Sequence, residues 1–193
     1  VSDLPGIRLK LARHNPEEKL WNYLVYHYHY QSYRIIVGAH IKVMAYAGEI
    51  PVACLAWSSS VFRIQCRDEL IGWNHEQRNA NIRHVANNAR FLILPWIQVK
   101  NLASHILGLS VKQVSRQWES VYRYPLYLLE TFVERARFKG TCYQAANWVG
   151  IGQTKGHAKK NGRFYCHGNI KDVYVYPLYS DFKERLLKTG GES

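Results

Sequence analysis

Two apolar runs near the start of the chain predict paired strands. Residues Ile41 to Ala47 and Ile50 to Trp57 are strand-like, and only Gly48 and Glu49 separate them. A short polar connection that contains glycine, placed between two such runs, is typical of a β-hairpin. The residues before them are more polar, with Asn15 and Pro16 opening a short helix. We therefore expect residues 1–25 to form an entry segment that leads into the core.

The middle of the chain shows helical and strand-like patterns in turn. Asn74, with Gln77 three residues later, fits a capping box. The helix that it opens is expected to carry one apolar stripe, formed by Ile82, Val85, Ala86 and Ala89. Phe91 to Val99 follows as a strand, and Pro95 within it predicts a bulge or an edge, since proline cannot donate to a ladder. Asn101 then caps a long amphipathic helix.

The last third continues the alternation of strands and helices. Leu126 to Val133 predicts a strand, Thr141 opens a short helix, and Val173 to Leu178 predicts a final strand. A glycine-rich basic loop lies between the last two, and a charged helical tail covers residues 181–193. Without repeats or linkers, residues 26–180 are expected to form a single α/β domain, a mixed central sheet flanked by helices.

This order of elements resembles the GNAT acyltransferases. The resemblance implies a V-shaped split between two adjacent strands, here Phe91–Val99 and Leu126–Val133. It also implies a donor whose pyrophosphate rests on the N-terminus of the helix that starts at Asn101. The turn before that helix, residues 99–104, departs from the GNAT pattern because it contains no glycine. The cofactor therefore stays unknown, with a coenzyme A thioester and an aminoacyl donor as candidates.

A second resemblance extends over roughly residues 20–180. It is carried by strings that stand in order along the chain: Ile71-Gly72-Trp73, Asn87 to Trp96, Asn101 to His105, Leu129 to Val133, Gly140 to Trp148 and Val175 to Leu178. Together they resemble the domain of unknown function of the Druantia A family, which occurs in bacterial anti-phage systems and in transposase-associated proteins. The resemblance implies a prokaryotic defence or mobile-element context, in which other defence-system subunits are candidate partners.

Charge separates this chain from an average globular protein. It has 193 residues, 47% of them hydrophobic, and a formal net charge of +12. These values exclude a disordered tail and a disulfide-built miniprotein, and they favour a polyanionic partner. No acid occurs in residues 77–118 or 135–171. The second stretch supplies the residues predicted to bind nucleic acid: Arg137, Lys139, Lys155, Lys159, Lys160 and Arg163. The alternative is a solubilising surface.

The cysteines and the apolar runs bear on the cellular compartment. The four cysteines include no C-x-x-C pair, so we expect a reducing cytoplasm. The longest apolar runs are about half the length of a membrane-spanning helix, so no membrane contact is expected. A metal site from His27, His29, Cys166 and His167 matches no common spacing, and we predict none. Because the chain begins at Val1, whether further residues precede it stays an open question.

Two residues are candidates for catalysis. Cys142 follows Thr141 at a helix start, where the helix dipole and nearby Arg137 and Lys139 would lower the pKa of the thiol and favour a nucleophile. The alternative is a small buried residue. Glu130 lies mid-strand on an apolar face, where burial would raise its pKa and make it a base. The alternative is a buried acid paired with an arginine, for which Arg90 is a candidate.

Other polar residues are candidates for ligand binding. They are Asn88, Arg90, Trp96, Asn101, Ser104, His105, Thr141 and Asn147. Capping explains several of them equally well, because Asn and Thr commonly begin or end helices.

Three functions stay open. The first is a GNAT-like acyl- or aminoacyl-transferase that acts on or with a nucleic acid or a nucleotide-bearing ligand. The second is a catalytically silent nucleic-acid-binding module of a defence assembly. The third, ranked last, is a nuclease or transposase accessory, because no cluster of acids suited to two metal ions is evident.

Overall fold

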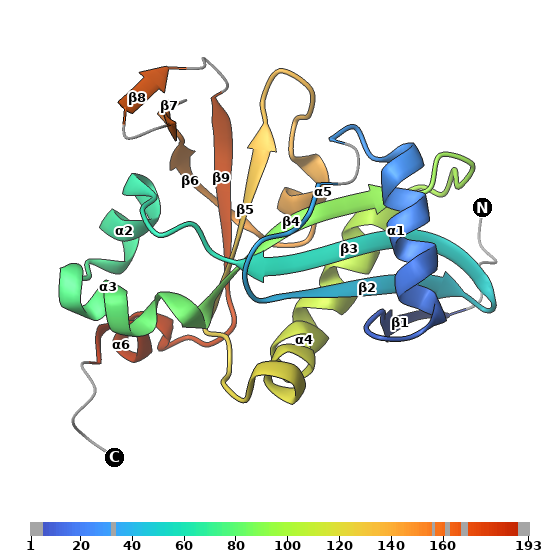
Figure 1. Cartoon of the computed structure of the whole chain (residues 1–193), viewed down its shortest axis with the longest axis horizontal. Coiled ribbons are helices and arrows are strands. Elements are labelled where there is room, and N and C mark those ends of the chain that lie inside the picture. The colour runs from blue at the N-terminus through green and yellow to red at the C-terminus, as the bar shows by residue number, and fades with distance from the viewer. Residues whose placement is uncertain (1–5, 32–33, 156, 161–162, 167–169, 189–193) are drawn as a thin grey trace. The chain divides into compact units, whose positions relative to one another are not determined.

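The computed structural model describes residues 6–31, 34–155, 157–160, 163–166 and 170–188, with the backbone alone for 157–160 and 163–166. The chain divides into two compact units, each built from two separate segments. Unit 1 comprises residues 1–59 and 86–125, and unit 2 comprises residues 60–85 and 126–193. Figure 1 labels the elements along the chain.

Unit 1 is built on a sheet with the strand order β1-β2-β3-β4. Its elements are β1 (Ile7–Leu11), α1 (Pro16–Tyr28), β2 (His40–Ala47), β3 (Ile50–Ser59), β4 (Val85–Ile93) and α4 (Leu102–Tyr122). Each neighbouring pair of these strands is antiparallel. The hairpin predicted around Gly48 is confirmed, and this glycine takes a φ of 60°, which the tight connection requires.

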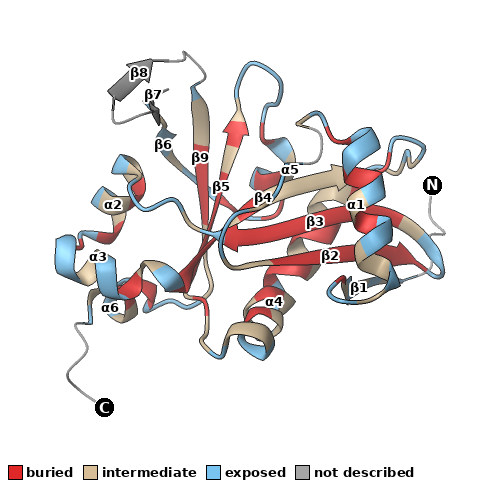
Figure 2. Cartoon of the chain, viewed as in Figure 1, coloured by how far each residue is buried: buried red, intermediate tan, exposed pale blue. Residues whose placement is uncertain are grey.

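Helices cover both faces of this sheet. On one face Trp21 and Leu24 of α1 pack with Met44, Cys54 and Ala56 in a single apolar cluster, and the Trp21 indole donates to the Leu55 carbonyl at 2.9 Å. On the other face the Trp57 indole donates to Ser110 of α4 at 3.2 Å. Figure 2 shows that β2 and β3 are buried along most of their length. Of residues 1–25, predicted as an entry segment, residues 7–25 thus contain a strand and most of a helix that packs in the core.

The start of β4 differs from the prediction. The helix that Asn74 opens ends at Asn81, a 3-10 turn covers Ile82–His84, and β4 begins at Val85. The expected helical stripe through Ala89 is therefore wrong, because Val85 and Ala86 are buried as strand residues instead. The bulge is also displaced. Ala56 and Trp57 pair with Arg90 and Asn88, so the register shifts at Ala89.

Pro95 lies beyond the strand. The Ile97 amide donates to the Leu94 carbonyl at 2.9 Å, which closes a turn around Pro95. The proline therefore ends β4 rather than bulging it. The V-shaped split predicted beside this strand would lie between β4 and β5, which belong mainly to different units, and it stays a prediction.

Unit 2 contributes the strands β5, β9 and β6, which are neighbours in that order in the seven-stranded sheet, and several helices. Its elements are α2 (Gln65–Ile71), α3 (His75–Asn81), η1 (Ile82–His84), β5 (Leu128–Glu134), α5 (Thr141–Ala145), β6 (Val149–Gln153), β7 (His157–Lys160), β8 (Arg163–Cys166), β9 (Lys171–Pro177) and α6 (Phe182–Leu187). β5 and β6 each pair with β9 in antiparallel fashion. The predicted capping box of Asn74 and Gln77 is confirmed.

The C-terminal helix is fastened to this unit. Asn81 donates through its side-chain amide to the carbonyls of Leu186 and Lys188, at 2.9 and 2.7 Å. Phe182 and Leu186 enter an apolar cluster with residues of α2, β5 and β9. The charged tail predicted for residues 181–193 therefore includes a helix that contributes to the core. In the part of the chain that the structure describes, no helix has both the length and the apolar character to span a bilayer.

Two glycines give a matched test of the backbone. A side chain at Gly140, where φ is 69°, would place its Cβ 2.8 Å from the Tyr174 hydroxyl, whereas a Cβ at Gly108 in α4 would meet no atom within 4 Å. We expect Gly140→Ala to lower the free energy of unfolding by about 1–3 kcal/mol. Gly108→Ala should raise it by about 0.5–1 kcal/mol, since alanine loses less entropy in a helix. Urea denaturation of both variants measures these changes.

Candidate functional site

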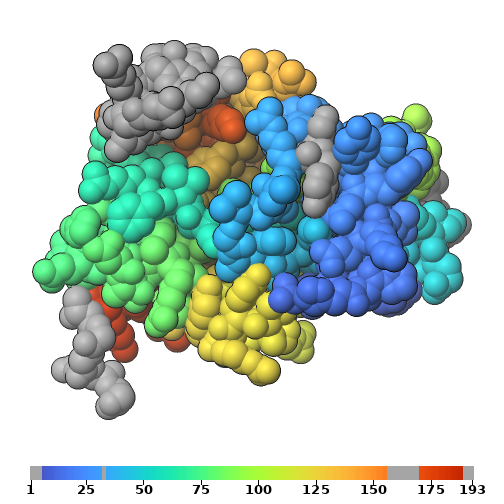
Figure 3. Space-filling model, viewed as in Figure 1, coloured from blue at the N-terminus to red at the C-terminus, as the bar shows by residue number. Residues whose placement is uncertain are grey.

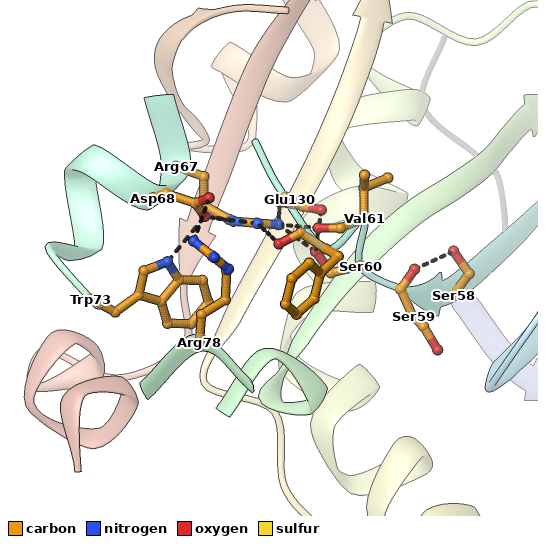
Figure 4. Close-up of polar contacts among 10 residues, drawn as sticks. Ser58, Ser59, Ser60, Val61, Arg67, Asp68, Trp73, Arg78 and Glu130 are labelled. Carbon is orange, nitrogen blue, oxygen red and sulfur yellow. Dashed lines mark hydrogen bonds and ion pairs between the residues drawn. The ribbon is translucent and has the colours of Figure 1, made fainter. Parts of the chain in front are cut away.

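A buried polar cluster in unit 2 centres on Arg67 of α2. The side chain of Arg67 is fully buried, and its guanidinium donates to five residues (Figure 4). Nη1 lies 3.0 Å from Glu130 Oε2, 2.6 Å from Ser60 Oγ and 2.8 Å from the Val61 carbonyl. Nη2 lies 2.8 Å from Asp68 Oδ1 and 3.2 Å from the Phe62 carbonyl. One cation thus joins β5 to the segment that precedes α2.

Glu130 is held on both oxygens within this cluster. Its side chain is fully buried, and the Ser60 hydroxyl donates to Oε1 at 2.5 Å while Arg67 donates to Oε2. Burial raises the pKa of the Glu130 carboxyl above its ordinary value, and Arg67 and Ser60 act in the opposite direction. The carboxyl therefore has the raised pKa expected of a general base, but its lone pairs are directed at donors of the same cluster.

The partner of Glu130 is Arg67 and not Arg90, the candidate named from the sequence. Arg90 lies in unit 1, whereas Glu130 and Arg67 both lie in unit 2. Sequence reasoning missed Arg67 and Ser60. The available signal was weak: an arginine directly before Asp68, in a segment whose apolar residues, Leu70, Ile71 and Trp73, come after it. Trp73 donates to Asp68 Oδ1 at 3.0 Å and lies beneath the Arg67 guanidinium.

Cys142 does not have the environment expected of a nucleophile. The helix α5 begins at Thr141, and the residue at its N-cap is Gly140 rather than Thr141. Burial raises the pKa of the Cys142 thiol, and the backbone hydrogen bonds that oppose this are weaker. The expectation of a lowered pKa is therefore corrected, because loss of hydration outweighs the effect of a helix that is a single turn long.

The other candidates in unit 2 have simpler surroundings. Asn147 takes a φ of 63° directly after α5, which fits the alternative that it ends the helix. Arg137 forms an exposed ion pair with Glu134 at 3.3 Å. Lys139 and Lys155 lie at the surface. The side chains of Lys159, Lys160 and Arg163 lie outside the described residues, so their predicted role in binding nucleic acid stays a prediction.

A shallow groove also lies in unit 2. It has a volume of about 520 Å³ and is lined by residues of β6 and β9, namely Gly150, Gly152, Gln153, Asp172, Val173 and Tyr174. Gly152 forms part of its floor with a φ of 143°, and a Cβ there would lie 3.0 Å from Cys66 Cβ. Tyr174 is positioned by Gln144, whose side-chain amide donates to its hydroxyl at 3.1 Å.

Unit 1 contains the turn that leads into α4. Asn101 takes the left-handed conformation with a φ of 62°, and its side chain forms no capping bond to any described residue. It therefore stands at the N-cap as predicted, but it acts through its backbone. The Asn101 carbonyl accepts from the Ser104 hydroxyl at 3.0 Å and from the His105 amide at 3.0 Å. Asparagine is the residue other than glycine that most readily adopts this conformation.

Arg90 is a half-buried cation on β4. Its Nη1 donates to the Ala89 carbonyl at 2.7 Å, and among the residues that the structure describes it has no ion pair. Burial lowers the pKa of the Arg90 guanidinium, and Arg34 adds a repulsive charge. The same surroundings lower the pKa of His29 to about 4, chiefly through burial and secondarily through Arg90. Asn88 donates to the carbonyls of Ala56 and Arg90 and so fixes the bulge.

Trp96 lies at the surface beside the end of α1. Its ring contacts Tyr28 edge-on, with the ring centroids 5.1 Å apart. Among the described residues no group of three or more His, Cys, Asp or Glu side chains is placed to hold a metal ion. The described site candidates thus fall into two sets, with Asn88, Arg90, Trp96 and the α4 turn in unit 1 and Glu130 and Cys142 in unit 2.

The sequence matches a model of a known protein family. The family model described as "Druantia protein DruA" matches residues 5–165. A comparison with curated proteins finds no match.

Solved structures show the fold. An acetyltransferase of Bacillus subtilis in complex with CoA superposes with a TM-score of 0.58 at 10% identity, covering 90% of this chain and 100% of its own. A chimera of spermidine N-acetyltransferase SpeG from Vibrio cholerae and hSSAT gives 0.55 at 12% identity, covering 95% and 99%. The aminoglycoside acetyltransferase AAC(6')-Ib, in complex with coenzyme A and kanamycin, gives 0.54 at 12% identity, covering 93% and 98%. The chain therefore has the mixed α/β fold of the GNAT acetyltransferases, as the order of its elements predicts.

The Arg67 cluster yields a test of stability. We expect Arg67→Met to lower the free energy of unfolding at pH 7 by about 3–5 kcal/mol, because it leaves the buried Glu130 carboxyl with only the Ser60 hydroxyl as a donor and removes the donor to two backbone carbonyls. Glu130→Gln keeps an acceptor for Arg67 and should cost about 1–2 kcal/mol. Arg8→Met, which removes an exposed ion pair with Glu49, is the control and should change the value by less than about 1 kcal/mol. Equal losses in all three variants would contradict the cluster's role.

The pH dependence of Arg67→Met follows from the same cluster. Without Arg67, burial raises the pKa of Glu130 with only Ser60 opposing it. The folded protein then keeps a proton that the unfolded chain releases above the ordinary pKa of 4.5. Because the pKa of Glu130 is higher without Arg67 than with it, the variant should lose stability relative to the unmodified chain as the pH rises above the pKa that Glu130 has in the unmodified fold. Thermal unfolding as a function of pH measures the difference, and a constant difference would contradict it.

Proposed function

Because this chain belongs to the family of the Druantia protein DruA, we propose that it works in anti-phage defence as an acyl- or aminoacyl-transferase-type enzyme. Its acceptor or carrier would be a nucleic acid or a nucleotide-bearing ligand. The family name supports the defence context, and the fold supports the type of reaction. The net charge of +12 supports a polyanionic acceptor.

The observation that carries this proposal is the turn before α4. A phosphate can approach a helix start closely where the backbone turns sharply and presents free N–H groups. The first turn of α4 contains no acidic residue, Lys100 before it is exposed, and Asn101 adopts the conformation that glycine would favour. The glycine missing from this turn is therefore compensated in backbone geometry, and the residues fit a diphosphate-bearing donor.

Coenzyme A is the donor that this fit favours. Residues of the turn, Lys100 to Ser104, would hold its diphosphate, and the thioester would supply an activated acyl carbonyl. An acceptor amine or hydroxyl can attack such a carbonyl directly, so the reaction needs no covalent enzyme intermediate. This agrees with the surroundings of Cys142, where burial raises the pKa of the thiol and keeps it protonated at neutral pH.

Titration with coenzyme A tests the turn. We expect the unmodified chain to bind coenzyme A in isothermal titration calorimetry, and Asn101→Val to weaken binding at least tenfold, because a β-branched residue cannot adopt the positive φ without strain. Asn101→Gly is the matched control and should bind as tightly as the unmodified chain. Mass spectrometry of oligonucleotides and nucleotides after incubation with acetyl-coenzyme A then reports transfer.

Two results would contradict the donor site. One is an absence of coenzyme A binding by both the unmodified chain and Asn101→Gly at millimolar ligand. The other is equal binding by all three proteins, which would place the ligand elsewhere.

A catalytically silent nucleic-acid-binding module is the second candidate function. A specific observation favours it, namely that both acceptor oxygens of Glu130 are occupied by Ser60 and Arg67, so the predicted base is tied to the protein. In this case nucleic acid binds without acyl transfer, and the logarithm of the affinity falls linearly with the logarithm of the salt concentration. Transfer to an oligonucleotide would exclude this candidate.

A further inference from the structure

The outer face of α1 is aromatic where a surface helix is ordinarily charged. Tyr23, Tyr26, His27 and Tyr28 all point to solvent, and Tyr26 is 60% exposed. The opposite face of the same helix buries Trp21, Leu24 and Val25, so the helix packs on the core without the exposed rings. Polar and charged residues normally occupy the outer face of an amphipathic helix. A cluster of exposed rings in their place is typical of an interaction surface.

These rings touch one another and continue onto the loop after β4. The ring centroids of Tyr23 and His27 lie 4.4 Å apart, and those of Tyr26 and His27 lie 4.9 Å apart. His27 is 6.2 Å from Tyr28, whose ring meets the 52% exposed Trp96 at 5.1 Å. We call these five residues the aromatic surface. It lies entirely within unit 1, and α1 lies at the surface of the face shown in Figure 3.

Negative charge is absent from the stretches of sequence that carry the five rings. Neither residues 19–48 nor residues 77–118 contain an Asp or a Glu. The acids at the other end of α1, Glu17 and Glu18, are neutralised by ion pairs with Lys10 and Lys42. The stretches that carry the five rings therefore bring no carboxylate of their own.

A cation lies near the end of α1, because the charge of Arg90 contributes to the lowered pKa of His29, the residue after Tyr28. Arg90 is half-buried without an ion pair among the described residues, and Tyr30 and Arg34 lie close enough to influence it electrostatically. Keeping a cation partly out of water without a counter-ion costs free energy, so its persistence favours a partner that brings an anion.

We propose that the aromatic surface binds single-stranded nucleic acid, with bases stacked on Tyr28 and Trp96 and backbone phosphates attracted to Arg90 and Arg34. Stacking on exposed rings requires unpaired bases, because base faces are hidden within a duplex. Rings combined with nearby cations are the common means by which proteins hold single strands without reading their sequence. This inference rests on the nucleic-acid ligand of the proposed function and specifies its strand form and the surface that receives it.

Binding to labelled oligonucleotides tests the proposal. Fluorescence anisotropy of the full chain with 20-nucleotide single strands of DNA and RNA, and with duplexes of the same sequence, should show tighter binding to the single strands. Tyr28→Ala and Trp96→Ala should each weaken single-strand binding by roughly five- to a hundredfold and leave duplex binding nearly unchanged. Tyr28→Phe and Trp96→Phe keep a stacking ring and should retain most of the affinity.

Tyr179→Ala is the matched control. Tyr179 is also an exposed tyrosine, but it lies in unit 2, where it stacks against Arg185. This substitution should not change single-strand affinity. Circular dichroism and thermal unfolding confirm that each variant is folded, which is expected because the substituted rings lie at the surface.

Intrinsic fluorescence gives an independent readout. All six tryptophans belong to the described part of the chain, and each of them except Trp96 is buried. Iodide should therefore quench chiefly Trp96, and a bound single strand should protect it. The iodide-accessible fraction should be lost in Trp96→Phe.

The outcomes separate this inference from the proposed function. If the unmodified chain binds nucleic acid but Tyr28→Ala and Trp96→Ala bind single strands equally well, the aromatic surface is overturned and the proposed function stands. If the chain binds no nucleic acid at low salt, both the surface and the nucleic-acid ligand are overturned, while coenzyme A binding still tests the donor site. If sedimentation shows a dimer that Tyr28→Ala and Trp96→Ala abolish, the surface is a self-association interface and the inference is overturned.

Discussion

One buried cation organises the second unit. Arg67 sits on α2, yet it donates to β5 through Glu130 and to the chain that precedes α2 through Ser60, Val61 and Phe62. A guanidinium in the interior is stable only if nearly all its N–H donors are hydrogen-bonded. Here the acceptors are two carboxylates, of Glu130 and Asp68, and two backbone carbonyls, of Val61 and Phe62. The position of α2 relative to β5 is thereby fixed by directional bonds as well as by apolar contact. Glu130 is part of this arrangement, so its charge serves first to hold the unit together.

At the start of α4, Asn101 adopts the left-handed backbone conformation that glycine adopts easily. Few residues tolerate a positive φ, and asparagine is one of them because its short polar side chain causes little steric conflict. A turn without glycine can thus still take a positive φ. Compared with glycine, asparagine also places a polar side chain next to the helix start.

Patterns local in sequence allowed much of the fold to be predicted. The hairpin around Gly48, the capping box of Asn74 and the helix after Asn101 depend on residues a few positions apart, and each is confirmed. The prediction failed where local preference was overridden. Residues 85–89 have helical periodicity, but pairing with β3 draws them into a strand. The Arg67–Glu130 pair joins residues 63 positions apart, and no local pattern specifies such a pairing. The pKa of Cys142 depended on burial, which a helix start alone does not reveal.

The distribution of polar groups between the units points to a division of labour. In unit 2 the buried cation has its acids close by, and its bonds are satisfied internally. In unit 1 the half-buried Arg90 has carbonyl contact but no described acid, and exposed rings replace charged side chains on α1. In the first arrangement the buried charges are paired within the protein, whereas the second leaves a partly desolvated cation without an acid among the described residues. A single strand bound as proposed would supply an anion to the cation of unit 1, whereas the buried cation of unit 2 already has its acids within the protein.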